Sequence, residues 1–381
     1  MPEPKSDQRT PKRVPIGEGH YAFVPELLPP ALDYPQTLVT EIHEAAAALG
    51  SVAAISRFVP NPRLLIVPFL SLEAVLSSRI EGTITTPSAV LEARVIPEAE
   101  VGVPEAEVRN YLDAMDYGIE HLPTLPLSLR LLKDLHAILM KNVRGYNRAP
   151  GEFRQGQVHI GSDTLETARY IPPPANLLPE LMSNWEHFLH SDVVPPLVQC
   201  AVAHAQFEMI HPFWDGNGRI GRLFISLALI AKGHLPQPLL FLSAYLEKHR
   251  EQYYQHLSAI STTGDWRGWI SFFMRAVITQ ANAAVNAAKA LLDLRDDVRH
   301  GLNTRSVHAL SLVDLLFESP VVTVGVVQER LNLPYPTARR AIAALEEAGF
   351  LTQMYHKRPA RFMASKIFDV LEMAADSAHP Q

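Results

Sequence analysis

A segment near the middle of the chain, residues 211–222, combines the residue types that bind and activate phosphates. It reads HPFWDGNGRIGR. Gly216 and Gly218 flank an asparagine just before a predicted helix, so backbone N–H groups are exposed beside the positive end of the helix dipole. Arg219 and Arg222 are three residues apart and share one helical face. These features predict an anion cradle large enough for more than one phosphate.

Two further side chains in this segment indicate chemistry at a bound phosphate. Asp215 would repel a bare phosphate, but Mg²⁺ in proteins commonly binds one or two carboxylates together with phosphate oxygens. His211 carries an imidazole that titrates near neutral pH, which suits a general base beside an activated phosphate. For any one of these residues a simple helix-capping turn is the better explanation, whereas the whole set within so short a segment favours the phosphate site.

The segment matches HPFx[D/E]GNGRxxR, the signature of the Fic family, at every fixed position. The chain resembles that family over roughly residues 60–290, which implies a protein adenylyltransferase that uses ATP and Mg²⁺. By this resemblance, His211 would deprotonate a Ser, Thr or Tyr hydroxyl of a target protein, and Asp215 would hold Mg²⁺ against the α- and β-phosphates. The residues that would bind the nucleotide are Gly216, Asn217, Gly218, Arg219, Gly221 and Arg222.

A carboxylate near the end of an earlier predicted helix, residues 68–82, lies in an electrostatically unfavourable place. Glu81 in the last turn faces the negative end of the helix dipole and should attract a cationic partner. The sequence SSRIEG, which starts at Ser77, resembles the inhibitory motif [S/T]xxxE[G/N] of many Fic proteins. The resemblance implies that Ser77 and Glu81 belong to an inhibitory helix and that Glu81 pairs with Arg222. An exposed glutamate without a role, and a role in removing AMP from a modified target, remain alternatives.

Residues 151–174 are rich in glycine and end in three prolines, and they predict a short hairpin or extended flap. In the Fic family the corresponding hairpin takes the main chain of the target as an added strand. The flap residues would be Gln157, Val158, His159 and Ile160. An ordinary hairpin that covers the core is the alternative. His136 and His204 have no metal-ligand spacing and are expected to be helix-packing or surface histidines.

The predicted fold is mainly α-helical: a Fic-fold helical domain with a small β-hairpin flap, followed by a C-terminal winged-helix domain. The predicted boundaries are a disordered tail at 1–15, an N-terminal helical region at 16–100, a Fic core at 101–295 and a winged-helix domain at 305–370.

Residues 305–365 predict a helix, a short strand, two helices and a basic hairpin, an order that resembles a winged helix with a basic surface. Between residues 335 and 366 there are six Lys or Arg and two Asp or Glu, a local charge of +4. Such a patch indicates contact with DNA phosphates, and use of the module for protein contacts or dimerisation is the alternative. The side chains expected to face DNA are Thr337, Arg339 and Arg340 on the recognition helix and Lys357, Arg358 and Arg361 on the wing.

The composition restricts the remaining possibilities. The 381 residues carry 34 basic and 40 acidic side chains, so any nucleic-acid contact must be local. A single cysteine excludes an intramolecular disulfide, and no apolar run approaches about 18 residues, so a cytoplasmic protein is expected. A Fic enzyme with another nucleotide donor, and a DNA-binding regulator that senses nucleotide, are the alternative functions. Self-modification and a homodimer also remain open.

Overall fold

The computed structural model forms two compact units, each assembled from three separated segments. The first unit comprises Met1–Ala47, Asp113–His234 and Leu246–Ile278, and the second comprises Ala48–Leu112, Leu235–Tyr245 and Thr279–Gln381. Each unit takes residues from both halves of the chain. The predicted sequential domains remain a prediction. The residues that the structure describes are 12–17, 19–58, 63–96, 100–143, 145, 147–162, 164–302, 306–354 and 359–376.

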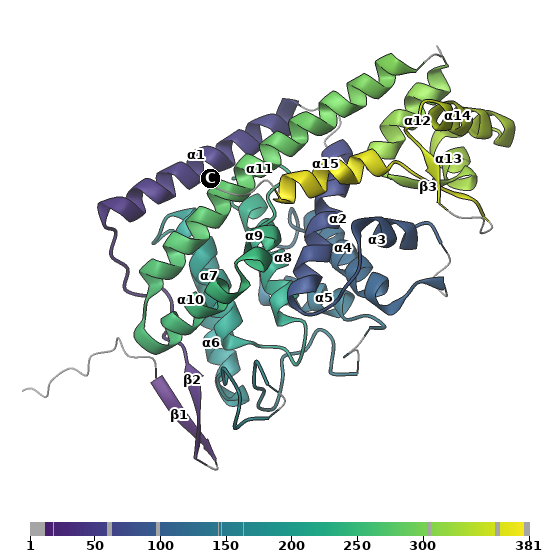
Figure 1. The fold of residues 1–381 in the computed structure, drawn as a ribbon. Coiled ribbons are helices and arrows are strands. Elements are labelled where there is room, and N and C mark those ends of the chain that lie inside the picture. The colour runs from purple at the N-terminus through teal and green to yellow at the C-terminus, as the bar shows by residue number, and fades with distance from the viewer. Residues whose placement is uncertain are drawn as a thin grey trace, which may run out of the picture. The chain divides into compact units, whose positions relative to one another are not determined.

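The first unit is built around the helix α7 (Pro196–Ile210), which is buried on almost every side. It packs against α6 (Leu178–Leu189), α8 (Asn217–Ala231) and α10 (Arg250–Thr263) (Figure 1). The indole N–H groups of Trp185 and Trp269 donate hydrogen bonds to α7 carbonyls at 2.8 and 2.9 Å. A helix that is apolar all round is typical of the centre of a core, so α7 provides a rigid base for the loop that follows it.

Other helices complete the first unit. They are α5 (Leu129–Leu139), the 3₁₀ turn η2 (Ala175–Leu177), the first part of α1 (Gln36–Phe58), the end of α4 (Val103–His121) and the start of α11 (Trp266–Gly301).

The predicted disordered tail at residues 1–15 is wrong from Lys12 onward. Residues 12–17 form β1 (Lys12–Gly17), which pairs antiparallel with β2 (His20–Val24), while residues 1–11 lie outside the described residues (Figure 1). Arg13 lies over the ring of Phe23 at 4.8 Å, and the Phe23 N–H donates to the Ile171 carbonyl at 2.9 Å. The charge and proline of this segment suggested disorder, but a two-stranded ribbon tolerates both at its edge.

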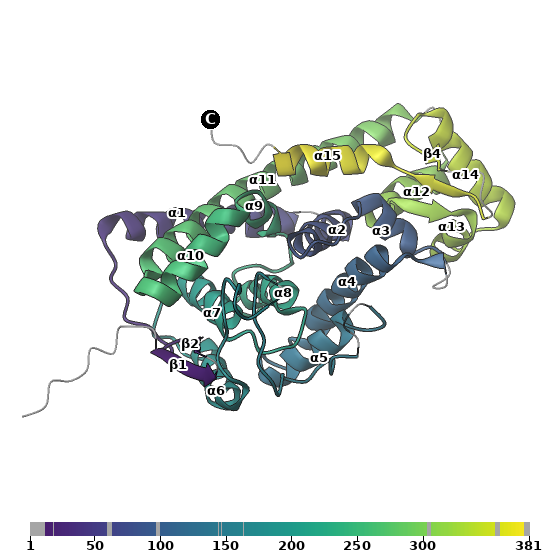
Figure 2. The ribbon, with the colours of Figure 1, turned by 60° about the horizontal axis from the view of Figure 1, so that its bottom comes forward.

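The second unit contains α2 (Arg63–Ile80), α3 (Pro87–Ala93) and the first residues of α9 (Ser243–Lys248), together with the C-terminal elements (Figure 2). The helix predicted at 68–82 begins five residues earlier than expected, and Pro68 lies inside it. Gly82 follows the helix at φ +91°, which is the predicted glycine stop. The α9 helix is short, and α10 begins at Arg250, two residues after its end.

The C-terminal elements are α12 (Val307–Glu318), β3 (Val321–Thr323), α13 (Val324–Leu331), α14 (Tyr335–Glu347), β4 (Thr352–Gln353), β5 (Arg361–Met363) and α15 (Ser365–Asp376). The strands form a sheet in the order β3-β5-β4, with antiparallel pairs. The helix, strand, helix, helix and hairpin order is the predicted one. The winged-helix assignment of this region remains a prediction.

The C-terminal region shares a hydrophobic core with α2 and α3 instead of hanging from a linker. Val321 and Phe368 pack in one cluster with Leu91 of α3 and Val67 of α2. The expected linker at 295–305 is wrong up to residue 301, because α11 continues through it and Arg295 donates to Asp314 of α12 at 2.7 Å. The sequence there is charged and contains glycine, but helical ion pairs account for the charges.

Among the described residues, one helix is long and apolar enough to cross a membrane by length and composition alone: Gln36–Arg57 of α1. A single such helix is weak evidence. Its buried residues Leu38, Ala45, Leu49 and Val52 recur at intervals of three, four and seven residues, which is the pattern of a helix that packs one face on protein.

Candidate functional site

The predicted phosphate cradle is the loop between α7 and α8, in the first unit. α7 ends at Ile210, and His211 follows in the left-handed backbone conformation with φ 51° and ψ 60°. Gly216 caps α8 at φ 75°, so the helix begins at Asn217. The turn therefore brings His211, Asp215 and the first two turns of α8 together, as the sequence predicted. The N–H groups at the start of α8 are the positive end of a fifteen-residue helix.

Asn217 holds the loop in shape. Its Oδ1 accepts from the Phe213 N–H at 2.8 Å, and its Nδ2 donates to the Phe213 carbonyl at 2.9 Å. The side chain is 2% exposed. The amide was predicted to bind phosphate directly, but this clamp uses the oxygen and one amide proton, so its main contribution is to the shape of the turn.

His136 of α5 also stabilises this loop by hydrogen bonds. Its Nδ1 accepts the Gly151 N–H at 2.8 Å, so the neutral ring carries its proton on Nε2 and donates to the Asp215 carbonyl at 3.0 Å. Burial lowers the pKa of His136 to about 4, which keeps the ring neutral. The ring also stacks on Phe213 with centroids 3.8 Å apart. Of the two expectations for this histidine, packing within the protein is confirmed.

Asp215 presents one carboxylate at the mouth of the loop. Its Oδ1 accepts from the Gly216 N–H at 2.7 Å and lies 3.9 Å from the Arg219 guanidinium, and the side chain is 33% exposed. The described residues contain no group of three or more His, Cys, Asp or Glu that could hold a metal ion by themselves. A single, partly exposed carboxylate beside a phosphate cradle fits Mg²⁺, which takes its other ligands from phosphate and water.

Gly216 and Gly218 are the two glycines of the cradle, and Gly216 has no room for a side chain. A Cβ there would lie 2.9 Å from the Met140 sulfur, and its positive φ also disfavours other residues. Gly221, predicted with the nucleotide-binding residues, instead faces α7. A Cβ at Gly221 would lie 2.4 Å from Glu208 Oε1, so this glycine lets α7 and α8 approach closely.

Arg219 and Arg222 are both 3% exposed on the first turns of α8. Beside them His204 links α7 to α8: its Nδ1 donates to the Gly221 carbonyl and its Nε2 accepts from the Tyr253 hydroxyl, both at 3.0 Å. Burial, and then the nearby Arg222 charge, lower the pKa of His204 to about 3. Tyr253 is 1% exposed and belongs to this core.

The flap is present as a narrow antiparallel pairing. The Ile160 N–H donates to the Tyr170 carbonyl at 2.9 Å, and the Tyr170 N–H donates to the Ile160 carbonyl at 3.3 Å. Gln157 Nε2 donates across the flap to the Pro172 carbonyl at 2.8 Å. Val158 and His159 are half-buried between these two contacts. The Tyr170 hydroxyl donates to the Met209 carbonyl of α7 at 3.0 Å, so the flap is fastened near the loop.

The inhibitory residues lie in the second unit. Ser77 is fully buried in the last turns of α2. Glu81 is exposed just beyond the helix, and its N–H donates to the Ser78 carbonyl at 3.1 Å. The predicted pairing of Glu81 with Arg222 remains a prediction.

The structure corrects the predicted DNA-binding surface at Arg361. The side chain is 4% exposed and forms ion pairs with Glu92 and, at 3.3 Å, with Glu100. Its charge is thus compensated away from solvent, because carboxylates from outside the C-terminal region reach it. Arg339 pairs with Glu346 at 2.7 Å, Arg340 is exposed and Thr337 is half-buried. Lys357 and Arg358 lie outside the described residues.

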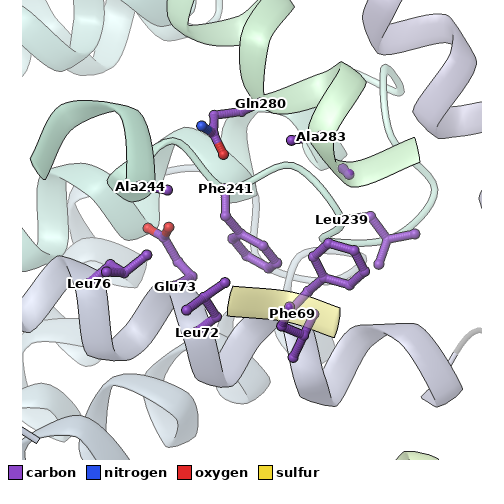
Figure 3. A pocket seen from close by; sticks show the side chains of 11 residues that line it. Phe69, Leu72, Glu73, Leu76, Leu239, Phe241, Ala244, Gln280 and Ala283 are labelled. Atoms are coloured by element: carbon purple, nitrogen blue, oxygen red, sulfur yellow. The ribbon is translucent and has the colours of Figure 1, made fainter. Parts of the chain in front are cut away.

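A cavity in the second unit is unsuited to a nucleotide. Its volume of about 30 Å³ is about one water molecule's share of liquid volume. Figure 3 shows Glu73 on α2 and Gln280 on α11 pointing into the cavity, with the Phe241 ring beside them. Glu73 accepts from the Ser243 N–H and hydroxyl, so its carboxylate is already held.

Sequence reasoning missed Arg154, which lies near the start of the flap segment 151–174 and is 2% exposed. Among the described residues, the acceptors of its guanidinium are backbone carbonyls, including that of His211 at 2.8 Å. Backbone acceptors leave no trace in a sequence, so only the phrase GEFR, which opens the flap, could have drawn attention to it.

Residues 126–229 match the Fic/DOC family, and residues 39–120 match the Fic/DOC family N-terminal. Protein adenylyltransferase Fic of Drosophila virilis is 28% identical over 204 residues, 51% of this chain and 38% of the fly protein. The same protein of Drosophila grimshawi is 27% identical over 253 residues, 64% and 46% of the two chains. The chain thus spans less than half the length of these curated relatives.

Solved structures share the fold. A Fic family protein from Desulfovibrio desulfuricans G20 superposes with a TM-score of 0.56 and 20% identity, over 88% of this chain and 98% of that one. Residues 134–508 of Fic-1 from C. elegans give a TM-score of 0.52 and 18% identity, over 68% and 75%.

Proposed function

The chain belongs to the Fic/DOC family, and we propose that it transfers AMP from ATP to a Ser, Thr or Tyr hydroxyl of a target protein. The observation that carries this proposal is the loop between α7 and α8, where a histidine, a carboxylate, a helix N-terminus and two arginines meet. The names of the fly relatives support the nucleotide and the reaction type. We further propose a cytoplasmic location.

In the proposed reaction, His211 takes the proton from the target hydroxyl as its oxygen attacks the α-phosphorus of ATP. A bond forms between that oxygen and the phosphorus, and the bond from the phosphorus to the β-phosphate oxygen breaks. Pyrophosphate leaves. The N–H groups at the start of α8 face the phosphates, and Arg219 and Arg222 stabilise the charge that develops on the leaving group.

Asp215 would hold Mg²⁺, which when bound would offset phosphate charge and orient the nucleotide. Asn217 and His136 fix the backbone on either side of this carboxylate, through Phe213 and through the Asp215 carbonyl. Both side chains are buried, so the loop keeps its shape without a ligand. A preorganised turn of this kind reduces the reorganisation needed when the phosphates arrive.

The flap would position the target. Among the described residues, the half-buried segment Gln157–Ile160 has one β-bridge, at Ile160, and the Val158 carbonyl accepts from the Gln157 side chain at 3.0 Å. The backbone of His159 would be available to an added strand, which binds mainly through main-chain hydrogen bonds. This supports a target region that is extended, and the hydroxyl residue would then be directed toward His211.

Glu81 is proposed to restrain the enzyme. The support is its motif with Ser77 and its place just beyond the end of α2, where a carboxylate is unfavourable beside the C-terminal end of a helix. A cationic partner such as Arg222 would relieve that cost and would remove an arginine from phosphate binding. The same carboxylate could instead assist removal of AMP from a modified target.

The deciding experiment incubates wild type, Glu81→Gly and the double variant Glu81→Gly with His211→Ala, each with Mg²⁺ and α-labelled ATP. Protein-bound label is measured on a gel and the adduct by intact mass. We expect the strongest label in Glu81→Gly and none in the double variant.

Three other results are informative. Equal labelling of wild type and Glu81→Gly would contradict the proposal that Glu81 restrains the enzyme. Label with another nucleotide only would change the donor. Label in the double variant would show that His211 is not the general base of the reaction.

A further inference from the structure

Arg154 contacts three consecutive carbonyls of the loop that carries His211. Its backbone N–H donates to the Pro212 carbonyl at 2.9 Å, and its Nε donates to the His211 carbonyl at 2.8 Å. Its Nη2 is 3.3 Å from the Ile210 carbonyl. The last carbonyls of a helix need partners, and here one side chain supplies them where α7 ends.

The same guanidinium also contacts both legs of the flap. Nη1 donates to the Gly156 carbonyl at 2.8 Å, directly before Gln157, and Nη2 donates to the Pro173 carbonyl at 2.6 Å, near the end of the flap segment 151–174. Each guanidinium nitrogen therefore has an acceptor. Because a guanidinium is planar and rigid, it fixes the distances between the groups it binds.

The backbone of His211 needs such support. Its φ of 51° is in the left-handed region, which is uncommon for a residue with a Cβ. Such a conformation persists when the surrounding structure over-determines it, and it is typical of functional sites. The hydrogen bond from Arg154 Nε ends on the carbonyl of this very residue.

We propose that Arg154 is a positioning residue that holds His211 in its left-handed conformation and joins it to both legs of the flap. This one side chain thereby fixes the position of His211, the proposed base, relative to the flap, which is proposed to bind the target. The expected effect on kcat rests on the proposed AMP transfer. The expected effect on the structure of the flap rests on the hydrogen bonds alone.

The test replaces Arg154 with lysine, which keeps the charge but provides a single ammonium in place of the planar fork. Transfer is measured with α-labelled ATP in wild-type and Glu81→Gly backgrounds. We expect kcat to fall about 100-fold, as for a small misplacement of a reacting group, while KM for ATP stays within about twofold. Arg130→Lys, which alters an exposed arginine on α5, is the matched control and should leave both constants unchanged.

Amide hydrogen exchange gives a readout that needs no activity. The N–H groups of Ile160 and Arg169 are bonded across the flap at 2.9 Å, and we expect both to exchange at least about tenfold faster in Arg154→Lys. The amides in the middle of α7 should keep their wild-type rates. Faster exchange throughout α7 would mean a general loss of structure and would overturn a positioning role.

The outcomes separate the two proposals. If wild type and Glu81→Gly label no protein with any nucleotide, the proposed function fails, while the exchange experiment still tests Arg154. If wild type transfers AMP and Arg154→Lys transfers it equally well with unchanged flap exchange, the positioning role is wrong and the function stands. A rise in KM for ATP that matches the fall in kcat would place Arg154 in nucleotide binding and would also overturn the proposal.

Discussion

Arg154 in the first unit and Arg361 in the second are both buried arginines, and they are held in opposite ways. The acceptors of Arg154 are backbone carbonyls of a loop and a flap, and none of those described is a carboxylate. Arg361 is instead paired with Glu92 and Glu100. One arginine keeps its positive charge beside the candidate site and arranges backbone, whereas the charge of the other is compensated.

The difference indicates that Arg154 has a positioning role and that Arg361 has a structural one. A buried cation without a carboxylate is costly, and burial lowers the pKa of Arg154 to about 10, still protonated at neutral pH. Such a cost is tolerated where geometry must be exact to fractions of an ångström, as in a catalytic loop. The ion pairs of Arg361 join β5 to α3 through Glu92 and to the segment after α3 through Glu100, and they require no particular chemistry there.

The largest expected effect lies in the loop of the first unit. In the Glu81→Gly background, His211→Ala should reduce AMP transfer by at least about 100-fold, because a positioned general base contributes that much. The imidazole is partly exposed, so the free energy of unfolding should change little. Label transfer and urea unfolding of the same samples check this, and a large loss of stability with retained transfer would contradict it.

Arg361→Met should have the opposite effects, with lower stability and unchanged transfer of label. Removing the cation leaves two carboxylates with unbalanced charge, and we expect the free energy of unfolding of the second unit to fall by about 2 kcal/mol. The partial exposure of Glu92 and Glu100, 19% and 54%, keeps the figure below that of a fully buried pair. Urea unfolding of the full chain measures it, and transfer of label should not change.

The matched control is Arg330→Met in the same region. Arg330 pairs with Glu318 at 3.0 Å but is 48% exposed, so its loss should cost about 0.5 kcal/mol or less. Equal losses in the two variants would mean that burial does not distinguish the two ion pairs.

The sequence predicted the loop between α7 and α8 because its information is local. Two glycines, an aspartate and two arginines within one turn and a helix start need no distant partner to be recognised. Arg154 and His136 were missed as supports because their partners are carbonyl and N–H groups, which every residue carries.

Arg361 shows the complementary limit. Its local sequence is basic, and a count of nearby charges favoured a solvent-facing surface. Its partner Glu92 is 269 residues earlier in the chain, so nothing near Arg361 indicates the pairing. The strand at Lys12 was missed for the same reason, because its support comes from pairing with β2 and not from its own composition.

Two buried neutral histidines of the first unit, His136 and His204, predict a pH dependence of stability, and His204 has the lower pKa of the two. The pKa of His204 is lowered to about 3 in the folded chain, against 6.5 when unfolded. Its contribution to stability is therefore present above pH 6.5 and is lost as the pH falls from 6.5 toward 3, by about 1.4 kcal/mol per pH unit. Urea unfolding at pH 7.5 and pH 5 should show this loss in wild type and a smaller one in His204→Gln. The same loss in both would assign the pH dependence to other groups.

The smallest expected effect concerns the exposed basic side chains of the C-terminal region. If this region binds DNA, the contact must come from residues such as Arg340, which is exposed, and not from the buried Arg361. We expect Arg340→Gln to weaken binding of a random duplex at low salt and to reduce the slope of log affinity against log salt by about one. Arg361→Gln should leave that slope unchanged. Mobility shift over a range of salt concentrations measures both, and a wild-type chain that shifts no duplex at low salt would leave protein contact as the use of this surface.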